Sequence, residues 1–394
     1  MNDLEYLNKE LNEEYASLND VSWYYVSSYN NLSENFIRRF KDKLIWHEIS
    51  LKQKFSENFM REFKDLIDWD VISSHQVLSE DFIREFKDSI NWTRISYGQK
   101  LSENFIREFK DYVDWSDISY FQKLSEDFII EFKDCVELDN VVLKHVISED
   151  LILKLKDELT RIEWMYISRY QKLSESFIER FINELDWDNI SSYQKLSEDF
   201  IRKYKDKLNW KHISMFQKLS EDFIGEFKDL VYWVNVSKYQ KLSEKFMIEN
   251  EENLYWANIA KHQKLSDEFI KKYDLTIDED NWLYKTTKFK KDQVIKCGLY
   301  ECYDDYFIAF KSINLNRYSF YNFQYQYLKG EVYECHCDCT SEENSFGLSV
   351  WSENGAKRYN DDGLIVKVKV KYEDVGRLVH YSNKIRCSKI EILD

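Results

Sequence analysis

A period of 23 residues constrains the fold of this chain more than any other feature of its sequence. The phrase LSENFIREFKDYVDWSDISYFQK at 101–123 recurs with variations along much of the chain. A repeat of this length is typical of a solenoid, in which each unit buries one face against the next and none folds alone. The step lengthens by three residues after the sixth unit, and the units begin at Leu32, Phe55, Leu78, Leu101, Leu124, Ile147, Leu173, Leu196, Leu219, Leu242 and Leu265.

Each unit is predicted to form two helices joined by a tight turn. In the 101–123 unit, apolar residues recur at separations of three and four and therefore fall on one side of a first helix. Ser102 stands at the N-cap position of this helix. Asp114 stands at the N-cap position of a second helix, which begins at Trp115 and is about two turns long. The same cap is expected at Asp68, Asn91, Asp186 and Asn209.

Two other periodic structures fit the pattern less well. A coiled coil would continue its heptad, whereas the apolar spacing breaks near position 14 of every unit and restarts. A β-solenoid would need period-two alternation and Gly or Asn turns, which the units lack. We therefore predict an all-α solenoid of 23-residue helix-turn-helix repeats at 32–289. Residues 1–31 are expected to form a degenerate capping repeat, and Trp282 to mark the opposite cap.

The repeat period disappears beyond about residue 290, and the pattern changes. The segments KCGLYECYDDYFIAFKSI, KGEVYECHCDC, GLIVKVKVKY and KIRCSKIEIL alternate apolar and polar residues, as half-buried strands do. A short helix is predicted near 352–359. The fold class is therefore multidomain: the all-α solenoid is followed at 290–394 by a small, mainly antiparallel β (α+β) domain of typical single-domain size.

Comparison of the units with one another separates core positions from variable ones. Positions 1, 5, 6, 9, 13, 15 and 18 barely vary, whereas positions 16, 17 and 20 vary most. Because residues one and four apart lie close together on a helix, the variable positions are predicted to form a ridge that recognises a partner. Aromatic residues and Met favour this interpretation over an unconstrained exposed surface. The candidate partner-binding residues are Leu51, Thr93, Arg94, Tyr97, Ser116, Asp117, Tyr120, Tyr166, Lys211, His212 and Met215.

The charge of the chain argues against nonspecific nucleic-acid binding. The formal net charge is −16. Residues 290–394 hold 15 Lys and Arg against 16 Asp and Glu, so the preceding residues hold 41 against 56. Phosphate contacts need a basic surface, which an acidic solenoid does not provide on average. Nucleic acid is therefore an unlikely partner for the repeats.

The repeat resembles the LSEDFIREF-type repeats of giant-virus proteins and related phage and bacterial proteins. The Leu-Ser-Glu start, the Phe pair and the Trp coincide over roughly 32–273. The resemblance implies a viral interaction protein and implies no activity.

The tail resembles a β-rich module of phage, bacterial and giant-virus proteins to which no activity is assigned. An aromatic-Lys segment lies at Phe310 and Lys311, a Tyr-x-x-Gly-x-x-Tyr segment at 327–333, and a Lys-Ile-x-x-Ser-Lys-Ile strand at 384–392. The segment at 347–351 corresponds to a Gly-Phe-His-x-Cys-like stretch. This chain departs from that stretch, because Ser349 and Trp351 stand where the module often has His and Cys.

Three cysteines of the tail form the one cluster that suggests a metal. Thiolates and imidazole are good zinc ligands, and Cys335, His336, Cys337 and Cys339 are close in sequence. Structural zinc sites use ligand pairs a few residues apart with a second pair elsewhere, and a fourth ligand, such as Cys302 or Cys387, is unassigned. If the segment is a strand, the three cysteines share one face and can simply pack as small apolar side chains. We therefore predict no metal.

Enzymatic motifs are missing from the sequence. There is no Gly-rich phosphate loop, no nucleophile elbow and no His-Glu-x-x-His segment, so we predict neither a cofactor nor catalysis. The expected function is that of a protein-protein interaction scaffold with a host or viral protein partner, located in the cytoplasm and without a membrane segment. One alternative is a small-molecule or nucleotide-binding protein or enzyme centred on the tail. A further alternative is an RNA-associated factor that stacks bases on tyrosines.

Overall fold

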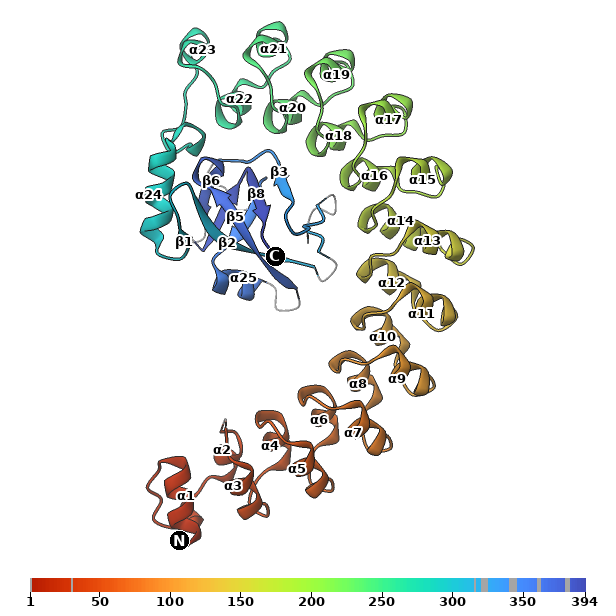
Figure 1. The fold of residues 1–394 in the computed structure, drawn as a ribbon, viewed down its shortest axis with the longest axis vertical. Helices are drawn as coiled ribbons and strands as arrows, with labels where there is room; N and C mark the ends of the chain where they lie inside the picture. Colours follow the sequence, from red (N-terminus) through yellow and green to blue (C-terminus); the bar gives the residue numbers. More distant parts are fainter. Residues whose placement is uncertain are drawn as a thin grey trace. The chain divides into compact units, whose positions relative to one another are not determined.

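The computed structural model describes residues 2–29, 31–314, 317–319, 325–339, 346–359, 363–379 and 383–394. The chain divides into two compact units, Met1–His145 and Val146–Asp394. Helical repeats make up the first unit and continue in the second, which ends in an antiparallel sheet of eight strands (Figure 1). The predicted fold class, α-helical repeats followed by a mainly antiparallel β domain, is confirmed. No helix in the described part of the chain has the length and apolar character needed to span a bilayer.

The Met1–His145 unit consists of paired short helices. It opens with α1 (Asp3–Leu11), η1 (Leu18–Asp20) and α2 (Trp23–Ser27). The first helices of its repeats are α3 (Glu34–Arg39), α5 (Glu57–Glu62), α7 (Glu80–Glu85), α9 (Glu103–Glu108) and α11 (Glu126–Glu131). The second helices are α4 (Trp46–Lys52), α6 (Trp69–His75), α8 (Trp92–Gly98), α10 (Trp115–Phe121) and α12 (Leu138–Lys144).

The Val146–Asp394 unit repeats the same helix pairs before its sheet. The first helices are α13 (Glu149–Leu155), α15 (Glu175–Arg180), α17 (Glu198–Lys203), α19 (Glu221–Glu226), α21 (Glu244–Glu249) and α23 (Asp267–Lys272). The second helices are α14 (Arg161–Tyr170), α16 (Trp187–Tyr193), α18 (Trp210–Phe216), α20 (Trp233–Tyr239) and α22 (Trp256–His262). Within each unit the first helices lie along one side of the stack and the second helices along the other (Figure 1).

Both helices of a repeat begin where the sequence predicts. Ser102 Oγ accepts a hydrogen bond from the Phe105 N–H at 3.2 Å, which caps α9. Asp114 Oδ1 accepts one from the Asp117 N–H at 3.1 Å, which caps α10. The other predicted second caps act in the same way on α6, α8, α16 and α18: Asp68, Asn91, Asp186 and Asn209.

Buried glutamines hold neighbouring repeats together. The side-chain amide of Gln122 donates to the carbonyls of Ser96 and Gln99 in the preceding repeat, at 2.7 and 2.8 Å. Its oxygen accepts from the Leu101 N–H at 3.0 Å. The backbone N–H and C=O groups that lack a partner at the ends of short helices are thus hydrogen-bonded by the glutamine. The junction therefore needs no water.

A buried serine and stacked aromatic rings complete the junction. Ser119 Oγ donates to the Trp115 carbonyl at 2.6 Å and accepts from the Glu137 N–H of the next repeat at 2.9 Å. The Trp115 ring lies 5.1 Å from the ring of Phe132 in the next repeat. Because each junction uses residues one repeat apart, the same contacts recur at 23-residue intervals.

The three-residue insertion is absorbed by a longer second helix. α14 begins at Arg161, a turn before Trp164, and Thr160 caps it. Glu163 completes a capping box by accepting from the Thr160 N–H at 2.8 Å. The rest of α14 keeps the repeat register, since Ser168 Oγ still donates to the Trp164 carbonyl at 2.7 Å.

The C-terminal domain is a sheet flanked by short helices. Between the last repeat and the sheet lie η2 (Trp282–Tyr284) and α24 (Thr287–Cys297). The remaining elements are β1 (Glu301–Cys302), β2 (Tyr306–Ile313), β3 (Val332–Glu334), β4 (Leu348–Trp351), α25 (Glu353–Tyr359), β5 (Leu364–Lys371), η3 (Tyr372–Asp374), β6 (Val375–Val379), β7 (Lys384–Cys387) and β8 (Lys389–Ile392).

The sheet does not follow the order of the chain. Its strands run β3-β8-β5-β2-β4-β7-β6, with β1 paired to β2, and every pair is antiparallel. The predicted helix near 352–359 is present as α25, which packs against β2 and β4. The core of this domain includes Val368, Ile385 and Trp282, the residue that the repeat pattern assigned to a cap.

Candidate functional site

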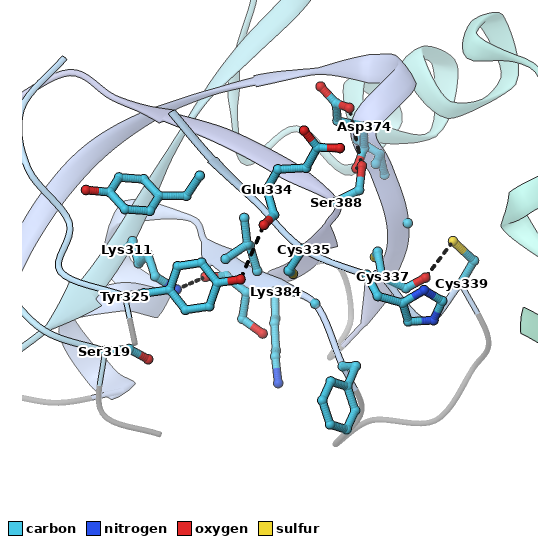
Figure 2. Close-up of a pocket in the computed structure, with 18 of the residues that line it drawn as sticks. Lys311, Ser319, Tyr325, Glu334, Cys335, Cys337, Cys339, Asp374, Lys384 and Ser388 are labelled. Atoms are coloured by element: carbon cyan, nitrogen blue, oxygen red, sulfur yellow. Dashed lines mark hydrogen bonds between the residues drawn. The ribbon is translucent and has the colours of Figure 1, made fainter. Parts of the chain in front are cut away.

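A cavity of about 2410 Å3 lies within the Val146–Asp394 unit. The C-terminal ends of α16, α18, α20 and α22 form one wall, and strands and loops of the C-terminal domain form the others. Figure 2 shows the part that the domain contributes, in which Lys311, Tyr325 and Lys384 lie on one side and Cys337 and Cys339 on the other. The fold therefore joins repeat ends and sheet residues that are far apart in the sequence.

The cavity is lined by more basic than acidic side chains, although the chain as a whole is acidic. Eight lysines and arginines of the described residues line it: Lys195, Lys218, Lys241, Lys264, Lys290, Lys311, Arg358 and Lys384. Four acidic residues line it: Glu334, Glu353, Glu373 and Asp374. A concave surface with an excess of one sign of charge concentrates ions of the other sign, so the cavity attracts anions.

Lys311 is the most deeply placed of these cations. It is 6% exposed, and its Nζ donates to the Ser349 carbonyl at 2.9 Å. The ammonium also lies 4.8 Å from the centroid of the Tyr327 ring and 5.8 Å from that of Trp351. Burial lowers the pKa of Lys311 to about 8, which still leaves the amine mostly protonated at neutral pH. A positive charge is thus fixed in an aromatic setting.

The Tyr-x-x-Gly-x-x-Tyr segment builds the wall beside Lys311. Gly330 adopts a φ of +80°, which a residue with a side chain rarely adopts, and so allows the chain to turn. The Tyr333 hydroxyl closes this turn by accepting from the Leu328 N–H at 2.8 Å. Tyr327 is fully buried and Tyr325 donates its hydroxyl to the Glu334 carbonyl at 3.2 Å. The motif therefore holds the tyrosines in place.

The opposite end of the cavity is where repeats and domain touch. The Phe346 ring lies 4.4 Å from the Tyr239 ring and 6.0 Å from the Phe216 ring, at the ends of α20 and α18. His262 Nδ1 lies 3.6 Å from Asp338 Oδ1, and both side chains are buried. Burial lowers the pKa of His262 to about 4, so this histidine is neutral at physiological pH.

The cysteine segment does not form the strand that would place its three cysteines on one face. β3 ends at Glu334, and Cys335, Cys337 and Cys339 lie in irregular chain beyond it. Cys337 and Cys339 nevertheless enter the core of the domain and Cys335 packs against it, as expected for small apolar side chains. A hydrogen bond with Cys339 and burial raise the pKa of the Cys337 thiol. Among the described residues, no three His, Cys, Asp or Glu side chains converge in a way that could hold a metal ion.

Three of the predicted ridge residues take part in a polar and aromatic surface in the Met1–His145 unit: Arg94, Tyr97 and Tyr120. Tyr97 on α8 is 38% exposed, and its ring lies 6.0 Å from that of Phe121 on α10. The Tyr120 ring lies 4.7 Å from the Phe121 ring and 3.9 Å from Lys144 Nζ. Arg94 donates to the Tyr97 hydroxyl at 3.3 Å. Thr93 and Ser116 are exposed on the same helices, Asp117 is half-buried there, and Leu51 is half-buried on α4.

The predicted ridge residues of the Val146–Asp394 unit lie on α14 and α18. Tyr166 packs its ring at 5.9 Å from that of Tyr170, and His212 Nδ1 is 2.9 Å from Ser192 Oγ. Lys211 is exposed. Met215 is the one member of the predicted set that lines the cavity.

The cavity wall uses a repeat position that the comparison of units passed over. Position 21, at the end of each second helix, is Tyr193, Phe216, Tyr239 and His262 in the repeats that line the cavity. A lysine follows two residues later in each of these repeats. The sequence contained this signal, because an aromatic residue followed by Gln-Lys also occurs at 121–123 and 170–172.

No family model, curated protein or solved structure matches the chain. The resemblances of its repeats and its tail to viral, phage and bacterial proteins therefore remain predictions.

Proposed function

We propose that the protein works by binding, and that the cavity of the Val146–Asp394 unit takes an anionic, phosphate-bearing ligand. The observation that carries this proposal is the basic lining of the cavity in an acidic chain. The basic lining attracts an anionic ligand over a distance, whereas the acidic surface of the rest of the chain repels it. The resemblance of the repeats to giant-virus proteins is the ground for proposing a viral origin.

Two features support a built site over a merely charged surface. Lys311 is held by Ser349 and by aromatic rings, so its charge is placed before a ligand arrives. The lysines at the ends of α16, α18 and α20 follow buried glutamines and are themselves exposed. Their side chains are therefore available to a ligand while the backbone that carries them is fixed.

Calorimetric titration of the full chain with inorganic tripolyphosphate tests the proposal. We expect binding that weakens as NaCl is raised, because ion pairs with phosphate release counterions. Replacing Lys195, Lys218 and Lys241 together by Gln should reduce the affinity at least about tenfold, which corresponds to about 1.4 kcal/mol. Heat signals of equal size in the parent and in this triple variant would refute the assignment of the site.

The repeats provide a matched control for that variant. Lys54, Lys100 and Lys123 occupy the same repeat position, are exposed, and lie outside the residues that line the cavity. Replacing these three by Gln changes the net charge by the same amount. The control should keep the affinity of the parent, whereas an equal loss would mean that the effect comes from total charge.

A second candidate function is recognition of a protein partner by the Met1–His145 unit. Its specific support is the aromatic group formed by Tyr97, Tyr120 and Phe121, in which Tyr97 and Phe121 are exposed, since aromatic rings are enriched at protein interfaces. A scaffold would bind there through ring anchors, with charged neighbours such as Arg94 setting specificity.

Affinity capture with the full chain tests this second function. A protein retained by the parent should be lost when Tyr97 and Tyr120 are replaced by Ala, with helix content unchanged by circular dichroism. The lysine variant at 195, 218 and 241 should still retain it. The second function is refuted if the captured protein is lost with the lysine variant but is still retained when Tyr97 and Tyr120 are replaced.

A further inference from the structure

Three consecutive second helices of the Val146–Asp394 unit end in the same three-residue pattern at the cavity. The pattern is an aromatic residue, Gln and Lys, and it occurs at 193–195, 216–218 and 239–241. All three aromatic residues and all three lysines line the cavity.

In the 216–218 pattern the glutamine between the aromatic residue and the lysine also borders the cavity, but its side chain is held in the junction between repeats. Gln217 is buried, and its amide donates to the carbonyls of Ser191 and Gln194 at 3.0 and 2.8 Å. Its oxygen accepts from the Leu196 N–H at 3.2 Å. The neighbours of this glutamine, Phe216 and Lys218, are half-buried and exposed respectively. Since the repeat is fixed, the rings and the cations alternate at a regular interval.

We infer that this series of rings and lysines binds single-stranded nucleic acid, with phosphates on the lysines and bases on the aromatic rings. The inference rests on the proposed function and names the class of its ligand. Proteins that bind single strands without sequence preference combine a basic groove with rings on which successive bases stack. Duplexes offer no unstacked base to such rings, so a single strand fits this wall and a duplex does not.

The rings already contact other planar groups within the chain. Phe346 packs on Tyr239 and Phe216 at ring distances of 4.4 and 6.0 Å. The Arg169 guanidinium lies 5.0 Å from the Tyr193 ring centroid, and guanidinium planes also stack on bases. A base that stacks on Tyr193 lies next to Arg169. A base that stacks on Phe216 or Tyr239 either replaces the Phe346 ring there or packs beside it.

The opposite wall supplies further charge to the same strand. Lys311, Arg358 and Lys384 come from β2, α25 and β7 and line the same cavity. An acidic peptide would also satisfy the cations but would leave the rings without planar partners. The rings at a regular interval therefore favour bases over peptide carboxylates.

Fluorescence anisotropy with the full chain and a labelled 12-residue oligothymidylate tests the inference. The decisive comparison is an abasic sugar-phosphate oligomer of equal length, which keeps the phosphates and lacks the bases. We expect the oligothymidylate to bind at least about tenfold more tightly than the abasic oligomer and than a duplex of the same length. We also expect the affinity to fall with salt.

A ring variant with a matched control completes the test. Replacing Tyr193 by Ala should weaken oligothymidylate binding by about tenfold and tripolyphosphate binding much less, because tripolyphosphate has no base to stack on the ring. Phe121 occupies the same repeat position outside the cavity lining, so replacing it by Ala should change neither.

The outcomes separate this inference from the proposed function. Equal binding of oligothymidylate, the abasic oligomer and polyglutamate would overturn the inference and leave a general anion site. If neither tripolyphosphate nor oligothymidylate binds, both the inference and the proposed function are wrong.

Discussion

The repeats and the C-terminal domain bury polar side chains in different ways. In the repeats, each buried Gln and Ser repeats the same hydrogen bonds one unit later, as Gln122 and Ser119 do. In the domain, buried charged groups occur once each: Arg386 is fully buried and donates to the Asp338 carbonyl at 2.8 Å, and Lys311 donates to Ser349. The array of repeats can therefore lose one of many equivalent junctions and stay folded, whereas the C-terminal domain depends on contacts that each occur once.

The largest expected effect concerns a glycine of the domain. A Cβ added at Gly376 would lie 2.1 Å from Cys337 Sγ and 3.2 Å from the Arg386 carbonyl oxygen. Gly376→Ala should therefore lower the free energy of unfolding by about 4 kcal/mol, measured by urea denaturation, because the core must shift. Gly225 in α19 has no atom within 4 Å of the added Cβ. Gly225→Ala should instead stabilise the chain by about 0.5 to 1 kcal/mol, and similar losses in both variants would break the contrast.

The next effect is a pH dependence of the contact between repeats and domain. The pKa of His262 is lowered by burial to about 4, from 6.5 when unfolded. Between these values the unfolded chain binds a proton that the folded chain does not, so stability falls as pH drops from about 6.5 to about 4. Between pH 6.5 and pH 4 the parent should lose about 3 kcal/mol more of its free energy of unfolding than the His262→Gln variant, measured by urea denaturation at several pH values. Parallel pH curves for the two proteins would show that His262 is not buried as described.

His47 of the first unit offers the opposite case. The hydrogen bond that His47 Nδ1 donates to Asp68 Oδ2 raises the pKa of the exposed His47 above its usual value. Its stabilising contribution is therefore present at low pH and is lost as pH rises through that pKa. Relative to the His47→Gln variant, the parent should therefore gain free energy of unfolding as pH falls, whereas relative to His262→Gln it loses it. Urea denaturation at several pH values measures both differences.

The sequence predicted the repeats well because their determinants are local. Ser102 and Asp114 cap helices through atoms three residues away, and the apolar spacing selects the buried face of each helix. The glutamine junctions escaped prediction because the two carbonyls that accept from Gln122 lie in the preceding repeat. Capping preferences describe one helix at a time and carry no information about such a neighbour.

The cavity could not be assembled from the sequence, although its components could be recognised. The sequence places Lys311 in an alternating, strand-like segment, but its partner Ser349 comes from another strand. The order β3-β8-β5-β2-β4-β7-β6 that brings them together depends on pairings between distant segments, which periodicity does not specify. Trp282 shows the same limit, since its aromatic spacing continues the repeat while its side chain packs with the sheet.

A smaller effect is expected for one glutamine of the array. Gln122→Met keeps the size of the side chain but leaves the Leu101 N–H and the carbonyls of Ser96 and Gln99 without their partner. The cost should be about 2 kcal/mol in urea denaturation, because orphaned buried backbone groups lose their hydrogen bonds. Lys123→Met, at the exposed neighbour, is the control and should change stability by less than about 0.5 kcal/mol. A cost as large as that of Gly376→Ala would mean that the array also depends on single contacts.

The smallest effect is expected from the charged pairs that run along the first helices. Arg107 Nε donates to Glu131 Oε2 of the next repeat at 2.8 Å, and the two side chains are 33% and 48% exposed. The guanidinium also lies 4.9 Å from the Phe128 ring centroid. Glu131→Gln should cost about 0.5 kcal/mol or less, because exposed ion pairs are screened by water and salt. Arg107→Ala should cost somewhat more, since it also removes the contact with the ring. A double-mutant cycle at low and high NaCl measures the pair itself, and a coupling above about 1 kcal/mol that persists at high salt would show that the array, like the domain, relies on a charge shielded from solvent.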